Sequence, residues 1–197
     1  FTADNGIAGR ELWRSDGTSM GTGLVTNIGS NASSSEPTKK VSLGEKIYFT
    51  TSYDHSIKLW ESDGTHINST VIYQSNTSIR DLSSQGGSLY FTTMNGSHII
   101  VKKLDIHTST VSDRGSIEIS SDRSEIIYAE VNDTVFYFMV NDSIYSHSDI
   151  GIQQLHSSTM ASSGIAGVGG KVFFVGNYGY GMELMYHWYN PGPVISV

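Results

Sequence analysis

Cysteine is absent from the 197 residues of this chain. Its absence excludes disulfide bonds, thiolate nucleophiles and zinc sites with cysteine ligands. Charged residues are sparse at 16%, and acidic residues prevail to give a formal net charge of −7. A scattered, net acidic set of charges lacks the basic patch that a phosphate backbone requires, which argues against nucleic-acid binding. No apolar run in the sequence reaches the roughly 18–20 residues of a membrane-spanning helix, so no membrane span is expected.

The chain lacks long apolar runs and helical periodicity, and it contains short aromatic segments that are expected to form strands. Each pairs bulky apolar residues with threonine or valine, a composition that favours pleated, half-buried strands. Their spacing of roughly 36 to 48 residues is typical of propeller blades. The four complete copies lie at 47–51, 89–93, 135–138 and 172–175, and Phe1-Thr2-Ala3 is the tail of a fifth.

A second repeated element follows the aromatic strand. The segment 11–18 (ELWRSDGT) recurs as 58–65 (KLWESDGT), 47 residues later. The Asp-Gly pair predicts a tight hairpin, because glycine accepts a positive φ without steric cost. The leucine and tryptophan are expected to fill a core between stacked sheets. The residues with these structural roles are Leu12, Trp13, Asp16, Gly17, Leu59, Trp60, Asp63 and Gly64.

The first eighteen residues, continued by Gly21-Thr22, resemble the ELWxSDGT repeat of a hyalin-like, propeller-forming family. That repeat occurs in tandem in extracellular and surface proteins, so the resemblance implies an extracellular array without catalytic residues. The motif is specific in the first copy and good in the second. From Phe91 onward it erodes, since Asp-Gly becomes Asp105-Ile106 and Asp149-Ile150, and the last copy lacks the aspartate.

These patterns predict an all-β fold, a β-propeller of about five four-stranded blades in a single domain over residues 1–197. The repeats run approximately over 1–39, 40–80, 81–125, 126–162 and 163–197. In the second repeat we expect strands at 40–43, 46–52, 57–62 and 69–74. The first blade is incomplete, because the chain begins inside its aromatic strand. We therefore expect a segment of a longer array or of an assembly, with the missing strand supplied from upstream or from a neighbouring subunit.

Six of the ten asparagines begin an Asn-x-Ser/Thr sequence. A chain this rich in serine and threonine would carry about two or three such matches by chance, so the excess favours N-glycosylation and an extracellular or cell-surface location. Asparagine preference for turns is the competing explanation. The predicted acceptors are Asn31, Asn68, Asn76, Asn95, Asn132 and Asn141.

The sequence shows no motif that is typical of a catalytic or metal-binding site. None of the seven histidines falls in a zinc-binding spacing, and no Gly-x-Ser-x-Gly elbow or phosphate loop is present. We expect no metal, no cofactor and no enzyme activity. Acids at a propeller mouth could serve a glycosidase, yet aspartate recurs at one turn position, which indicates a hairpin-building role. The acids concerned are Asp4, Glu11, Asp16, Asp54, Glu61 and Asp63.

The favoured function is a non-catalytic structural or assembly component of a cell-surface or fibrous structure, acting through protein–protein contacts. Its partners would be other copies of itself or neighbouring extracellular chains, in addition to its own N-linked glycans. A carbohydrate-binding, lectin-like propeller is the alternative, and a glycosidase is the weakest one. The aromatic cluster near the C-terminus serves the first two as a binding or docking surface, and its members are Tyr178, Tyr180, Tyr186, Trp188 and Tyr189.

Overall fold

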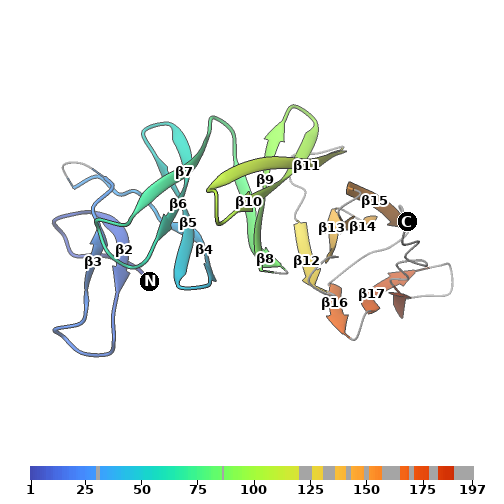
Figure 1. Ribbon diagram of the computed structural model, residues 1–197, viewed down its shortest axis with the longest axis horizontal. Helices are drawn as coiled ribbons and strands as arrows, with labels where there is room; N and C mark the ends of the chain where they lie inside the picture. The colour runs from blue at the N-terminus through green and yellow to red at the C-terminus, as the bar shows by residue number, and fades with distance from the viewer. Residues whose placement is uncertain are drawn as a thin grey trace. The chain divides into compact units, whose positions relative to one another are not determined.

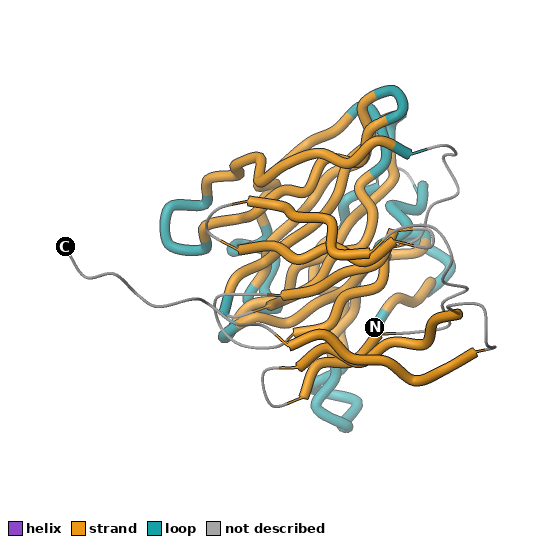
Figure 2. The backbone as a smooth tube through the Cα atoms, turned by 90° about the vertical axis from the view of Figure 1, so that its right-hand side faces the viewer, coloured by secondary structure: helices purple, strands orange, loops and turns teal. Residues whose placement is uncertain are grey.

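The computed structural model describes residues 1–29, 32–85, 87–119, 126–130, 136–140, 143–148, 151–156, 165–168, 171–177 and 182–188. Within these ranges the chain forms eighteen β-strands and no helix, as the sequence predicts (Figure 2). The strands belong to five antiparallel sheets, each built from strands that follow one another along the chain. The described residues contain no helix of the length and apolar character that crossing a bilayer requires.

Two compact units divide the chain, one over 1–118 and the other over 119–197. The first unit holds three sheets, which we call blades 1 to 3 (Figure 1). Blade 1 has three strands: β1 (Thr2–Asp4), β2 (Arg10–Arg14) and β3 (Gly23–Thr26). Blade 2 has four: β4 (Thr38–Leu43), β5 (Lys46–Tyr53), β6 (Ser56–Ser62) and β7 (Thr70–Ser75). Blade 3 also has four: β8 (Ile79–Gln85), β9 (Ser88–Asn95), β10 (His98–Asp105) and β11 (Thr110–Glu118).

The second unit holds blades 4 and 5. Blade 4 consists of β12 (Ile126–Glu130), β13 (Phe136–Val140), β14 (Ser143–Ser148) and β15 (Gly151–His156). Blade 5 consists of β16 (Ile165–Val168), β17 (Lys171–Asn177) and β18 (Met182–Trp188). The four strands expected in the second repeat are confirmed to within one or two residues at each end. The expected incomplete first blade is present as the three-stranded blade 1.

Two-residue turns join several pairs of neighbouring strands and explain the glycines found in them. Gly44 in the β4–β5 turn has a φ of 60°, and Gly96 in the β9–β10 turn has a φ of 58°. Both glycines take the first turn position, where a type II′ turn requires a positive φ. The β5–β6 turn differs, because Asp54 and His55 both adopt a φ of 56° without glycine.

A β-bulge recurs at the same step of the repeat, between the third and fourth strands of blades 2 to 4 and between the corresponding strands of blade 1. A bulge sharpens the local twist and rotates the side chains that follow it. Its recurrence shows that blades 3 and 4 keep the geometry of the Leu-Trp step although their sequences have lost that pair. The four steps are Leu12/Trp13, Leu59/Trp60, Val101/Lys102 and Ile144/Tyr145.

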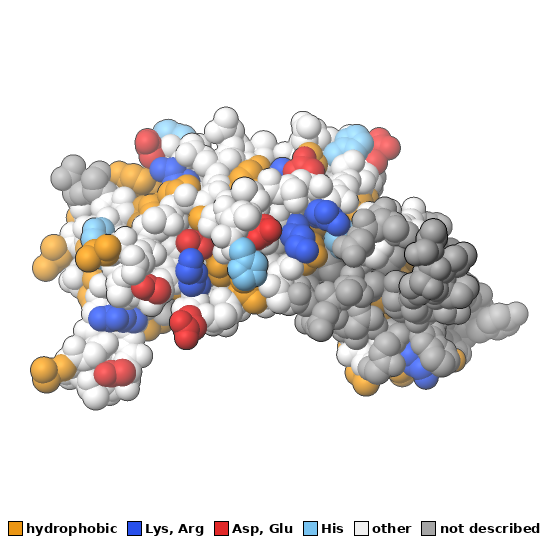
Figure 3. Space-filling model, viewed as in Figure 1, with side chains coloured by type: hydrophobic (Ala, Val, Ile, Leu, Met, Phe, Trp, Pro, Cys, Tyr) orange, Lys and Arg blue, Asp and Glu red, His pale blue; other side chains and the backbone are white. Residues whose placement is uncertain are grey.

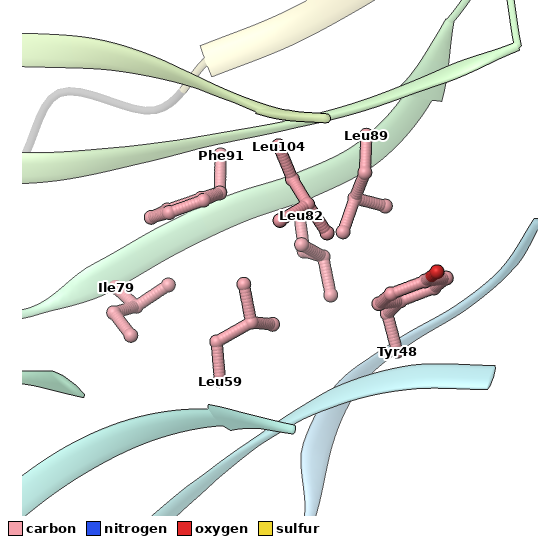
Figure 4. Packing of buried hydrophobic residues seen from close by; sticks show 7 residues of the cluster. All are labelled: Tyr48, Leu59, Ile79, Leu82, Leu89, Phe91 and Leu104. Carbon is pink, nitrogen blue, oxygen red and sulfur yellow. The ribbon is translucent and has the colours of Figure 1, made fainter. Parts of the chain in front are cut away.

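Consecutive aromatic residues serve opposite faces of a sheet, because side chains alternate along a strand. Tyr48 and Leu59 of blade 2 are buried toward blade 3, whereas Phe49 belongs to the core against blade 1. Figure 4 shows Tyr48 and Leu59 lying opposite the blade 3 side chains. The partners from blade 3 are Ile79, Leu82, Leu89, Phe91 and Leu104.

Two further cores show the same division of side chains. Between blades 1 and 2, Leu12 and Val25 pack with Phe49, and Trp60 stacks on Phe49 with ring centroids 6.2 Å apart. In the second unit, Tyr137 and Ile144 of blade 4 and Phe174 of blade 5 share a core with Met139 and Val172. The Tyr48-Phe49 pair on one strand therefore serves two cores, with Tyr48 in the core shared with blade 3 and Phe49 in the core shared with blade 1.

Candidate functional site

The first Ser-Asp-Gly-Thr turn closes on itself through side-chain hydrogen bonds. Asp16 Oδ1 accepts from the Thr18 backbone N–H at 2.9 Å and from Thr18 Oγ1 at 2.8 Å. Ser15 Oγ accepts from the Gly17 N–H at 3.0 Å and lies 2.6 Å from Thr22 Oγ1. The loop folds in this way because short oxygen-bearing side chains bond backbone groups two residues on, and Gly17 supplies a φ of 91°.

The second turn repeats this network at equivalent positions. Asp63 Oδ1 accepts from the Thr65 N–H at 2.9 Å and from Thr65 Oγ1 at 2.7 Å. Ser62 Oγ lies 2.8 Å from Ser69 Oγ, which donates to the Thr65 carbonyl at 2.6 Å. Gly64 has a φ of 89°, close to that of its counterpart in the first turn. The motif is thus a local structural unit of eight residues that includes the final threonine or serine.

One position in the unit differs between the copies. In the first turn a Cβ on Gly21 would lie 2.0 Å from Asp16 Oδ1. Only glycine therefore fits at this position without displacing the carboxylate. In the second turn the corresponding residue is Asn68, whose Nδ2 donates to Asp63 Oδ2 at 2.6 Å. The Asn68 amide therefore gives Asp63 one hydrogen bond that Asp16 does not receive from Gly21.

The turn carboxylates are held in their ionised form. Hydrogen bonds from Thr18 lower the pKa of Asp16, and those from Thr65 and Asn68 lower the pKa of Asp63. Asp105 in blade 3 behaves alike, since the N–H groups of His107 and Thr108 lower its pKa. A carboxylate kept ionised by donors within its own turn is poorly suited to general acid catalysis, which needs a raised pKa.

Glu11 is fully buried, a place that the sequence did not predict. Its Oε1 accepts from the Gly29 N–H at 2.8 Å, and its Oε2 accepts from Ser35 Oγ at 2.5 Å and from the Ile28 N–H at 3.3 Å. These three donors come from the segment that leads from β3 to β4. Glu11 therefore anchors the connection between blades 1 and 2. The second copy has Lys58 at the equivalent position, so comparing the two copies does not predict this role.

The two tryptophans of the motif differ in one hydrogen bond. Trp60 Nε1 donates to Thr51 Oγ1 at 2.9 Å. Trp13 Nε1 is buried and has no acceptor among the described residues. The strand registers explain the difference, because Thr51 pairs opposite Lys58 as Ala3 pairs opposite Glu11. Ala3 stands where the second copy has its threonine and offers no oxygen.

The remaining acids proposed for a mouth site also have separate structural roles. Asp4 Oδ1 accepts from the Gly6 N–H at 2.7 Å, and Asp54 occupies the β5–β6 turn. Glu61 forms an ion pair with Lys46 at 2.9 Å. Among the residues that the structure describes, no three histidine or acidic side chains gather in a way that could hold a metal ion.

The sequence-predicted glycan acceptors fall into two groups. Asn68, Asn76 and Asn95 are exposed on turns or strand ends of the first unit. Asn31, Asn132 and Asn141 lie outside the described residues, as do Tyr178, Tyr180 and Tyr189 of the proposed docking cluster. Of that cluster, Trp188 ends β18, and Tyr186 is 60% exposed with Lys171 Nζ 5.1 Å from its ring centroid.

One contact between blades was not foreseen. His66, within the second turn, lies with Nδ1 3.0 Å from Thr26 Oγ1 on β3. The turn of blade 2 therefore reaches back to the last strand of blade 1. Figure 3 shows one face of the molecule, on which charged side chains of both signs are interspersed over the described residues.

Comparisons with known proteins establish the fold alone. No protein-family model matches the chain, and no curated protein matches it. Solved propellers do match: TolB from Acinetobacter baumannii is 11% identical with a TM-score of 0.52, over 76% of this chain and 41% of that one. The propeller domain of the Trilobed protease from Pyrococcus furiosus is 14% identical with a TM-score of 0.56, over 90% and 64%.

A chain of a nidogen–laminin complex is similar at 11% identity and a TM-score of 0.52, over 85% of this chain and 64% of that one. The predicted β-propeller fold is thereby confirmed. The chain spans between 41% and 64% of the length of these three propellers.

Proposed function

We propose that the chain is a non-catalytic, extracellular glycoprotein repeat domain of the ELWxSDGT type, which serves as a structural or assembly component through protein–protein contacts. One observation carries the proposal. In both clear copies, the polar side chains that could do chemistry are bonded to their own turn, as Asp16 is to Thr18 and Asp63 to Thr65. Their recurrence at one structural position marks them as parts of the scaffold.

The exposed apolar side chains supply the contacts that the proposal requires. Leu184 is 74% exposed and Val168 65% exposed, both on blade 5, so these apolar side chains are available for contact with a partner. One of the similar propellers is itself part of a complex of nidogen with laminin, although a likeness at that level of identity concerns the fold alone.

The glycoprotein part of the proposal is supported by exposure. Asn76 and Asn95 are exposed, and neither side chain forms a hydrogen bond with the described residues. Asn68 is exposed as well, but its amide nitrogen already donates to Asp63. A glycan on Asn76 or Asn95 would therefore project into solvent without disturbing a turn, which makes these two the expected acceptors.

A lectin-like function is the second candidate, and Tyr186 is the observation that favours it. An exposed aromatic ring flanked by Lys171 offers the flat apolar surface on which a sugar ring can stack. A glycosidase is the weakest candidate, because the described acids have the separate structural roles given above.

The test expresses the chain in a secretory host. Enzymatic removal of N-glycans should lower the intact mass, and site mapping should place the removed glycans on Asn76 and Asn95. Electron microscopy should show ordered polymers that persist in excess free sugar. Elution from a glycan array by free sugar would support the lectin, and turnover of a glycoside that is lost on Asp16→Asn or Asp63→Asn would establish an enzyme; either result contradicts the structural role.

A further inference from the structure

Asparagine or aspartate precedes glycine at four places in the chain, and the side chain is held at three of them. The four steps are Asn5-Gly6, Asp16-Gly17, Asp63-Gly64 and Asn95-Gly96. In the first three, the side-chain Oδ1 accepts from the backbone N–H two residues on, at 2.9 to 3.0 Å. Asn95 differs, because its side chain forms no hydrogen bond with the described residues.

The turn between β9 and β10 leaves this step open to water. Strand pairing closes with Asn95 opposite His98, so the Gly96 N–H lies outside the ladder. Asn95 and Gly96 are both exposed. Gly96 has a φ of 58°, and a Cβ placed on it would meet no described atom within 4 Å. Water therefore reaches the side-chain amide and the neighbouring backbone nitrogen together, and nothing described obstructs their approach.

We infer that Asn95-Gly96 is a site of succinimide formation, at which unglycosylated Asn95 converts to aspartate and isoaspartate. The Gly96 nitrogen gives up its proton to a solvent base and attacks Asn95 Cγ. A bond forms between that nitrogen and Cγ, and the Cγ–Nδ2 bond breaks to release ammonia, which takes its proton from water. Glycine favours the attack because it has no Cβ beside the nucleophile and bends freely.

Water then opens the succinimide without any change of oxidation state. Addition at Cγ gives aspartate, and addition at the main-chain carbonyl carbon gives isoaspartate, whose chain runs on through the side chain. Both products place a carboxylate opposite His98. Isoaspartate also adds a methylene to the main chain beside a two-residue turn, and the length of that turn sets the register of β9 and β10. The strain falls next to Ile99, which is 1% exposed.

The same amide nitrogen is the acceptor of the proposed N-glycan, because Asn95-Gly96-Ser97 is an Asn-x-Ser sequence. Nδ2 either carries the glycan or leaves as ammonia, so the two fates exclude each other. A glycan on Nδ2 also surrounds Cγ with bulk and should protect the step. This protection rests on the glycoprotein role proposed above, whereas the succinimide reaction does not.

The experiment begins with the whole chain made in a host without N-glycosylation. The chain is incubated at mildly alkaline pH, and isoaspartate is quantified by peptide mapping. Two internal controls separate the causes. Asn5 precedes glycine but is held by the Ile7 and Ala8 N–H groups, whereas Asn76 is exposed and precedes Thr77.

Isoaspartate should accumulate at Asn95 at least about tenfold faster than at Asn5, where two hydrogen bonds must break first. Asn76 should react more slowly than Asn95, because the nitrogen that follows it belongs to threonine. Asn95→Gln should abolish the added negative charge at this turn, because its longer side chain cannot close the succinimide ring. Equal accumulation at Asn5 and Asn95, or none at Asn95, would overturn the inference.

Expression in a secretory host tests the protection. The unaltered chain should carry a glycan and no isoaspartate at Asn95, and Ser97→Ala, which removes only the glycosylation sequence, should restore the reaction. Equal reaction in the glycosylated chain and in Ser97→Ala would overturn the exclusion of one fate by the other. Isoaspartate at Asn95 in a secreted chain without a glycan there would contradict the acceptor role proposed for Asn95, but it would support the succinimide step.

Discussion

Replacing the same leucine position in two blades separates core burial from exposure. Leu59 is 0% exposed and is one of the seven buried side chains of one core, whereas Leu184 is 74% exposed. Leu59→Ala should lower the free energy of unfolding by about 2–5 kcal/mol, because apolar transfer and an unfilled cavity add. Leu184→Ala should change it by less than about 0.5 kcal/mol, as at an ordinary surface site.

The loss at Leu59 is large against a domain stability of about 5–15 kcal/mol. Leu59 lies in the first of two compact units, so a single unfolding midpoint would mix their responses. Hydrogen exchange read by mass spectrometry resolves the response by peptide. Leu59→Ala should accelerate exchange in β5, β6, β9 and β10, whose side chains line this core.

The measurement is made at low protein concentration, so that contacts between molecules do not contribute to the free energy of unfolding. A cost at Leu184 equal to that at Leu59 would refute the reasoning, since Leu184 would then be buried in the single chain. A negligible cost at Leu59 would refute the interblade core itself.

Three further perturbations test particular hydrogen bonds. Ala3→Thr should stabilise the first unit by about 0.5–1.5 kcal/mol in urea unfolding, because it gives Trp13 Nε1 the acceptor that Thr51 gives Trp60; no gain would show that Nε1 is satisfied otherwise. Glu11→Ala should cost about 1–3 kcal/mol or more, because it leaves the Gly29 N–H and Ser35 hydroxyl without their acceptor, and proteolysis between β3 and β4 should accelerate. Asp63 has a folded pKa below its ordinary value of 3.8, so its contribution to stability is present above that pH and is lost as pH falls through the lower folded pKa; Asp63→Asn should flatten this acid limb of the pH–stability curve.

The fold follows from the sequence because its determinants are local. The aromatic strand, the two-residue glycine turn and the Asp-Gly hairpin each specify their geometry within a few residues. The strands of the second repeat could therefore be placed to within one or two residues. The eroded copies were found by spacing, and the recurring bulge at Val101/Lys102 and Ile144/Tyr145 confirms that alignment.

The parts that sequence reasoning missed depend on contacts between distant segments. Glu11 differs from Lys58 at an otherwise repeated position, and only its burial by the β3–β4 connection reveals its role. The contact of His66 with Thr26 joins residues 40 apart in the chain. The sequence could have indicated a role for Ser69, because its spacing from Ser62 equals that of Thr22 from Ser15. Only the structure shows that each pair is joined by a hydrogen bond.

The eroded blades show which parts of the repeat the stack requires. Lys102 takes the place of tryptophan in blade 3, and its ammonium lies 5.4 Å from the ring centroid of Tyr73 on the preceding blade. Tyr145 takes that place in blade 4 and stacks on Phe138 at 5.5 Å. A long cationic stem and an aromatic ring can both cover the face of a neighbouring sheet. The position after the bulge therefore accepts several long side chains: Lys102 reaches a ring of the preceding blade, whereas Tyr145 stacks on the aromatic strand of its own blade, as Trp60 does.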